Sequence, residues 1–295
     1  MRSRRLEDHP QLWRWFASHR EVRESDDPVT YTLYRLCCAL SAEDSQFLPC
    51  LEATLSHLLT VENPASVVDG VERIMAQSGA PLAEFFTEAL EFALLQGCGG
   101  QFHDLMAALA AKSKLVTFYF LAAWMALNLD QLEDCINHCE LVTTPFAPIT
   151  TLHGQALLDL GEADEAIDVL QIAVKLAPEE PLAWFQLAKA FHLRDRNEEA
   201  LAALRRLRRI LPKNGEVCLM MVIVVAAVNE ADPALCEEAW NAIMPFAGDL
   251  TKDCVTVSHM FNLAMKSGRQ EYMTWVIDNA NRRRRSSLSP SFIQL

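Results

Sequence analysis

The sequence predicts an all-α protein, a right-handed α-solenoid of stacked helical hairpins. Apolar residues recur at helical spacing along nearly all of its 295 residues, with only ten glycines among them. Between Pro148 and Pro212 the sequence repeats with a period of 34 residues, the separation of Pro178 from Pro212. Such a period is typical of repeat architectures, in which each hairpin buries its apolar face against its neighbours.

Short side chains stand at equivalent places in the two clearest copies, residues 147–180 and 181–214. They let the two antiparallel helices of a hairpin approach closely, while larger apolar residues fill the space beside them. A proline closes each copy because it has no amide hydrogen to donate within a helix. The paired small positions are Gly154 with Ala188 and Ala166 with Ala200.

The N-terminal region, residues 1–97, is predicted to be helical throughout. Pro28 starts one helix, and Pro49 marks a kink or a boundary inside the next. Three glycines between positions 97 and 100 make the clearest break. No 34-residue period precedes this break, so the region is either a separate helical bundle or a set of diverged repeats. The predicted helices cover residues 10–22, 29–40, 42–59, 64–77 and 81–96.

Residues 98–249 are predicted to form the solenoid, beginning with a short helix over 102–111. A diverged repeat follows, with Ala123 and Cys135 at its small positions. The two clear copies come next, and a fourth repeat starts at Gly215. Its small positions fall on Val222 and Ala234.

Residues 250–281 supply the capping hairpin that a solenoid requires. Residues 282–295 form a basic, serine-rich tail. Its Arg282–Arg285 run before two serines is typical of a solvated, disordered terminus, or alternatively of a phosphorylation-type site.

The two clear copies closely resemble the tetratricopeptide repeat (TPR) family. The first copy departs from the family at Thr150 and His153, where bulky apolar residues are preferred. The resemblance implies a TPR-type α-solenoid with an N-terminal helical extension and a C-terminal capping hairpin. With each closing proline at the family's last signature position, the other signature residues are Gly154, Leu157, Ala166, Trp184, Ala188, Phe191 and Ala200.

The composition indicates a soluble, cytoplasmic protein. Nine cysteines, an odd number without disulfide-framework spacing, favour reduced thiols. No apolar segment follows the basic N-terminus as in a signal peptide. The strongly apolar, uncharged run over residues 217–228 is shorter than the roughly 18–20 residues that cross a bilayer. The formal net charge of −13 argues against a general nucleic-acid binder.

No catalytic, metal or cofactor site is predicted. Cys135, His138 and Cys139 share one helix face by their spacing, but the repeat register puts both cysteines in the core and no fourth ligand follows. The glycines near residue 100 lack the Lys-Ser/Thr pair of a phosphate loop. An enzyme with its site within residues 10–112 is an alternative that no motif supports.

The resemblance implies a concave groove lined by set positions of the first helix of each repeat. Carried over, those positions predict that the partner-binding residues are Thr151, Gln155, Leu182, Phe185, Lys189, His192, Leu219 and Ile223.

The helix over residues 218–228 is apolar on every side, so all of its faces have to be covered. Either the chain's own C-terminal hairpin or tail covers it, or an amphipathic partner segment does. We therefore predict a non-enzymatic scaffold, adaptor or chaperone that captures a helical or extended segment of another protein.

A second function class is a regulator that binds nucleic acid or another polyanion through two arginine clusters, one within residues 205–209 and the other at Arg282–Arg285. The arginines have a different role if they pair with the acidic residues of the neighbouring repeat. Such pairing would join adjacent repeats, or two copies of the chain head to tail. A third interpretation is a solvated helix face whose cations complement the helix dipole. The first cluster consists of Arg205, Arg206, Arg208 and Arg209.

Overall fold

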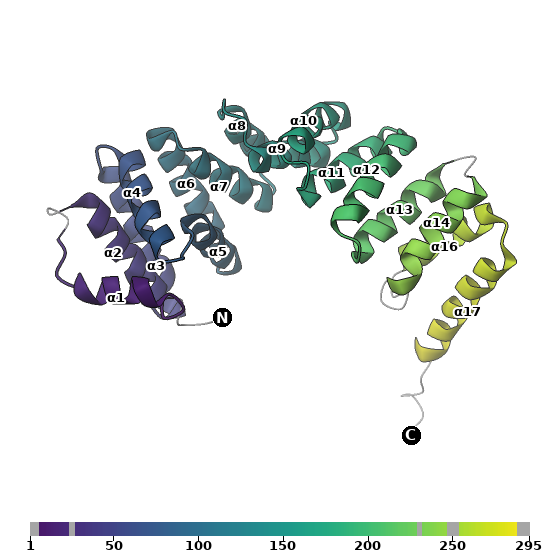
Figure 1. The fold of residues 1–295 in the computed structure, drawn as a ribbon, viewed down its shortest axis with the longest axis horizontal. Coiled ribbons are helices and arrows are strands. Elements are labelled where there is room, and N and C mark those ends of the chain that lie inside the picture. The colour runs from purple at the N-terminus through teal and green to yellow at the C-terminus, as the bar shows by residue number, and fades with distance from the viewer. Residues whose placement is uncertain (1–5, 24–26, 229–231, 247–253, 288–295) are drawn as a thin grey trace, which may run out of the picture. The chain divides into compact units, whose positions relative to one another are not determined.

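The computed structural model describes residues 6–23, 27–228, 232–246 and 254–287, and within these ranges every regular element is a helix (Figure 1). The predicted all-α solenoid class is confirmed. The chain divides into two compact units, unit 1 (residues 1–160) and unit 2 (residues 161–295). Unit 1 holds α1 (Pro10–Ser18), α2 (Pro28–Ser41), α3 (Asp44–Thr60), α4 (Pro64–Gln77), α5 (Leu82–Leu95), α6 (Gly99–Ser113), α7 (Val116–Asn128), α8 (Leu132–Glu140) and α9 (Ala147–Leu160).

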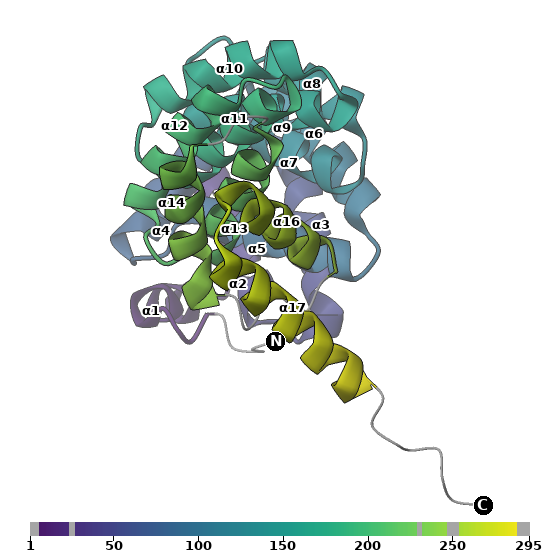
Figure 2. The ribbon, with the colours of Figure 1, turned by 90° about the vertical axis from the view of Figure 1, so that its right-hand side faces the viewer.

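Unit 2 continues the series of antiparallel hairpins, and its last helices face the reader in Figure 2. The helices are α10 (Ala163–Leu176), α11 (Pro181–Leu193), α12 (Asn197–Ile210), α13 (Gly215–Ala227), α14 (Pro233–Ile243), the 3₁₀ turn η1 (Met244–Phe246), α16 (Cys254–Ser267) and α17 (Gln270–Ser287).

Short polar side chains and prolines fix where several helices begin. Asp27 accepts hydrogen bonds from the Val29 amide and the Thr30 hydroxyl at the start of α2. Asn63 and Asn214 cap α4 and α13 in the same way. These caps satisfy amides that have no partner within the helix. Pro49, in contrast, lies inside α3 and does not end it.

Left-handed residues end the first helices of successive hairpins. Gly97 has a φ of 74°, and its amide and that of Cys98 bond back to the carbonyls of Leu94 and Ala93. This Schellman pattern recurs at Asp130 and Asp195. The connection between α5 and α6 at these glycines is therefore shorter than predicted. Gly99 already belongs to α6, so that helix starts three residues before the predicted one.

The core of unit 1 is rich in phenylalanine. Phe47 packs edge-on against Phe92 with ring centroids 5.2 Å apart, and Phe86 meets Phe118 at 5.8 Å. Edge-to-face pairs of this kind stabilise the fold beyond the free energy gained by burying the rings alone. Cys135 has no exposed surface and belongs to the same core, as the repeat register predicted.

Unit 2 shows the packing that the 34-residue period predicts. Ala166, Ala188 and Ala200 are completely buried, so each hairpin closes on short side chains. The indole of Trp184 donates a 2.8 Å hydrogen bond to the carbonyl of Pro178, which ties the start of α11 to the preceding turn.

The fourth repeat departs from its predicted register. Val222 is fully buried as expected, but Ala234 is exposed in the first turn of α14. Cys236, Ala239 and Ala242 are the small buried residues of that helix. The prediction for Ala234 was wrong because the connection before α14 is longer than the repeat period allows.

The last hairpin closes unit 2 through aromatic rings. Trp240 of α14 stacks on Tyr272 of α17 with ring centroids 4.1 Å apart and meets Trp275 edge-on at 5.7 Å. Residues 288–295 and the side chains of Arg282–Arg285 lie outside the described part of the chain. The domain boundaries at residues 97 and 249 stay predictions.

Replacing Ala200 by leucine should destabilise the protein by about 1–3 kcal/mol, because the added methyl groups have no space between α11 and α12. Urea unfolding followed by circular dichroism measures the change. Ala202→Leu is the matched control, since Ala202 is exposed on the same helix. Equal unfolding midpoints for the two variants would contradict close packing at Ala200.

Candidate partner-binding surface

The first helices of the three hairpins α11–α12, α13–α14 and α16–α17 share one burial pattern. Each buries two adjacent residues and a third one turn later. Because equivalent hairpins stack in the same orientation, equivalent positions lie on the same side of the stack. The buried residues are Leu187, Ala188 and Phe191 in α11, Met221, Val222 and Val225 in α13, and Leu263, Ala264 and Ser267 in α16.

Side chains that flank this pattern remain open to solvent on all three helices. We call them the A-helix face and divide it into two rows. The first row lies two residues before the first member of the adjacent buried pair, and the second row follows the pair directly. The first row is Phe185, Leu219 and Phe261, and the second row is Lys189, Ile223 and Met265.

Helix α13 is covered on three sides by its own chain, because α12, α14 and α16 all pack against it. The ammonium group of Lys266 on α16 also donates to the carbonyls of Ala226 and Val228 at the end of α13. The C-terminal hairpin therefore accounts for part of the apolarity of α13. Leu219 and Ile223 stay half-buried, with neither side chain sealed in the core.

Most of the predicted partner-binding residues in unit 2 reach the surface. Leu182 is 44% exposed, and Phe185 and Lys189 are partly exposed beside it on α11. The Nδ1 atom of His192 lies 2.8 Å from the side-chain oxygen of Asn197, which fixes the ring at the end of α11. Leu193 adds a further 58% exposed side chain to this end of the helix.

Thr151 and Gln155 lie on α9, in unit 1. Thr151 is only 2% exposed, and its hydroxyl donates to the carbonyl of Ala147. A side chain in that position has no surface for a partner, so Thr151 is not among the residues that we propose below. Gln155 is partly exposed.

The sequence reasoning missed Phe261 and Met265, which are 39% and 58% exposed on α16. Their helix lies outside the part with a clear 34-residue period, so no register was assigned to it. The signal was nevertheless present, because Met260, Leu263, Ala264 and Ser267 repeat the spacing of the buried residues in α11.

Three of the four arginines in the α12 cluster pair with carboxylates within unit 2. Arg205 makes a two-pronged contact with the carboxylate of Glu238, which Arg208 also approaches at 3.9 Å. Arg206 pairs with Glu179. Hydrogen bonding from Arg205 lowers the pKa of Glu238. Opposite charges thus connect neighbouring repeats, which was one of the three interpretations of this cluster.

Two histidines meet in unit 1, although their helices α6 and α8 are not adjacent in sequence. The Nε2 atoms of His103 and His138 are 3.2 Å apart, and Nδ1 of His103 lies 3.2 Å from the Asp104 carboxylate. If Nδ1–H of His103 donates to Asp104, its Nε2 accepts a hydrogen bond from the Nε2–H of His138. Nδ1 of His138 is then unprotonated, and it has no partner among the described residues. Burial, and then the neighbouring His103, lower the pKa of His138.

Cys135 and Cys139, which the sequence analysis considered as metal ligands and assigned to the core, lie in the core of unit 1. A hydrogen bond with Cys135, together with burial, raises the pKa of the Cys139 thiol. Across the described ranges, no three metal-ligating side chains converge on one point. None of the helices described here has the length and apolarity to cross a bilayer.

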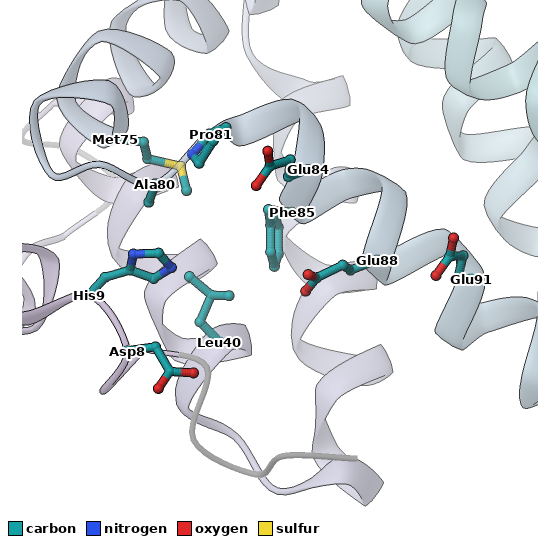
Figure 3. Close-up of a pocket in the computed structure, with 10 residues that line it drawn as sticks. All are labelled: Asp8, His9, Leu40, Met75, Ala80, Pro81, Glu84, Phe85, Glu88 and Glu91. Atoms are coloured by element: carbon teal, nitrogen blue, oxygen red, sulfur yellow. The ribbon is translucent and has the colours of Figure 1, made fainter. Parts of the chain in front are cut away.

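A cavity of about 380 Å³ opens in unit 1 beside α5 (Figure 3). Three carboxylates follow one another along that helix, and Leu40, Met75 and Phe85 form an apolar wall. No serine, cysteine or lysine is among the residues that line it, so the cavity offers no hydroxyl, thiol or amine nucleophile next to its single imidazole. The polar lining residues are Asp8, His9, Glu84, Glu88 and Glu91.

The fold and this face define a helical repeat protein, an α-solenoid. Residues 151–215 match the model of the tetratricopeptide repeat family. Among solved structures, the C-terminal part of a TPR repeat-containing protein from Cytophaga hutchinsonii is similar, with a TM-score of 0.54 at 12% identity over 86% of this chain and 95% of that one. Residues 151–215 therefore belong to the tetratricopeptide repeat family, whose repeats are in general protein-interaction modules.

Two further solved structures are similar over a smaller share of the chain. A thermophilic TPR protein from Thermus thermophilus has a TM-score of 0.47 at 14% identity, covering 61% of this chain and 98% of that one. MamA from Desulfovibrio magneticus has a TM-score of 0.48 at 15% identity, with 56% and 95% covered. Comparison with curated proteins finds no match.

The free energy of unfolding should fall as the pH drops below about 6.5, the ordinary histidine pKa. The unfolded chain binds a proton there that folded His138 binds less readily, because its pKa is lowered. Urea unfolding at several pH values between 8 and 5 measures this loss, at most about 1.4 kcal/mol per pH unit for one proton. His138→Gln should unfold with a shallower pH dependence. Identical slopes would rule out a role for the histidine pair.

Proposed function

We propose that this chain is a non-catalytic module that captures a segment of a partner protein on the A-helix face of unit 2. The observation that supports the proposal is the row of partly exposed apolar residues, Phe185, Leu219 and Phe261, at equivalent positions of three successive first helices. Contiguous exposed apolar surface of this kind marks interaction sites in soluble proteins.

The aliphatic and aromatic side chains of this face would contribute most of the binding free energy. Removing apolar surface from water releases roughly 25 cal/mol per Å². Lys189 and His192 would orient the partner at the α11 end, since polar groups contribute more to specificity than to affinity. A scaffold, an adaptor and a chaperone that shields apolar segments would all use the face in this way.

Binding of a polyanion receives less support from the structure. Arg205, Arg206 and Arg208 already have carboxylate partners on neighbouring helices. A nucleic acid would have to displace Glu238 and Glu179 before it could neutralise these cations. We therefore do not propose this function.

Leu219→Asp combined with Ile223→Asp should abolish capture of the partner, because two carboxylates would face an apolar ligand surface. Affinity purification of the tagged protein from its native cell, with mass spectrometry of the bound proteins, measures the loss. The matched control is Ile172→Asp with Leu176→Asp, an exposed apolar pair with the same spacing on α10. If the folded Leu219/Ile223 variant retains the same proteins as the wild type, the proposal is wrong.

A further inference from the structure

We propose that the partner segment is an amphipathic helix with apolar side chains at seven-residue spacing and a carboxylate at the end that contacts α11. This inference rests on the proposed function and specifies the chemistry of its ligand. Three features of the A-helix face lead to it: the spacing of its helices, the width of its apolar band and the position of its charge.

The spacing of the helices matches one heptad of a bound helix. Packed helices lie roughly 8–10 Å apart, and seven residues of an α-helix rise by about 10.5 Å. Because α13 and α16 pack directly against each other, a ligand helix that crosses them would present side chains about one heptad apart to the two helices. Phe185, Leu219 and Phe261 are the residues that would receive this first column of side chains.

The width of the apolar band favours a helix over an extended strand. The second row begins four residues after the first on each helix, which is about 6 Å along the helix axis. An amphipathic helix covers two such rows at once, because its apolar stripe contains two columns of side chains. An extended segment presents a single file of side chains to one side, and it would leave Ile223 and Met265 uncovered.

One charge marks the α11 end of the band. Lys189 is the only Lys, Arg, Asp or Glu in the two rows, and it makes no ion pair with any residue that the structure describes. The other cation of these three helices, Lys266, is bound to the carbonyls at the end of α13. A ligand carboxylate would pair with Lys189, whereas a ligand cation would face a like charge in a partly desolvated place.

The probes for a test are three fluorescein-labelled peptides of about three heptads each. Two are model helices with leucine on one stripe that differ only in carrying glutamate or lysine beside that stripe. The third has the composition of the glutamate peptide, with its leucines rearranged to alternate as in a strand. Fluorescence anisotropy of each peptide with the full chain, at physiological salt, gives the three affinities.

We expect the acidic helix to bind at least about tenfold more tightly than the basic helix or the strand-patterned peptide. Lys189→Glu should reverse the preference between the two helices. Lys175→Glu on α10, an exposed lysine away from the face, should leave it unchanged. Circular dichroism confirms that each variant is folded, and Lys189→Gln should give an intermediate preference.

Equal or tighter binding of the basic helix would overturn the proposed chemistry, and so would tighter binding of the strand-patterned peptide. Leu219→Asp with Ile223→Asp separates this failure from a failure of the surface itself. If the wild type binds one of the peptides and this variant does not, the face is the binding site and only the proposed ligand class is wrong. If it binds every peptide as the wild type does, both proposals fall. Sedimentation showing a dimer that this variant disrupts would identify a second copy as the occupant instead.

Discussion

The close approach of paired helices at short side chains is the constraint on which the rest of unit 2 depends. Ala166, Ala188 and Ala200 have no exposed surface, and a larger residue there would separate the helices. Because α11, α13 and α16 bury residues at equivalent positions, each of these first helices turns the same side toward its neighbours. The side that is left over is then the same for α11, α13 and α16, so a continuous face arises from the stacking itself.

Packing within the stack requires some side chains of these helices to be apolar and leaves the residue type at other positions open. Met221, Val222 and Val225 on α13 have to be apolar because they are buried. Leu219 and Ile223 are only half-buried, so packing does not require an apolar side chain at either position. Exposed apolar residues at places where polar ones would fold equally well are a sign of binding. Arg205, Arg206 and Arg208 of α12 are not part of this face. They form ion pairs with carboxylates of neighbouring repeats.

Much of the fold could be predicted from the sequence, because its signals are local. Small residues 34 positions apart and a helical apolar pattern identified the repeats, and most of the helices start within three residues of prediction. The exposed position of Ala234 could not be predicted, because it depends on the length of the connection before α14. The local sequence also does not decide whether Pro49 interrupts α3 or is accommodated within it. The same limit affected the candidate site. Leu219 and Ile223 were identified by register, whereas Phe261 and Met265 lie on a helix whose register only the structure reveals.

Covalent mapping of a bound helix is the most direct measurement of whether the A-helix face captures a partner. A photoreactive phenylalanine derivative would replace Leu219 in one sample and Ile172 in another, and each would be irradiated with the acidic model helix. The account predicts that the adduct forms from position 219 and not from position 172, and that it lies in the apolar stripe of the peptide. An adduct from position 172 alone, or equal yields from both positions, would contradict it.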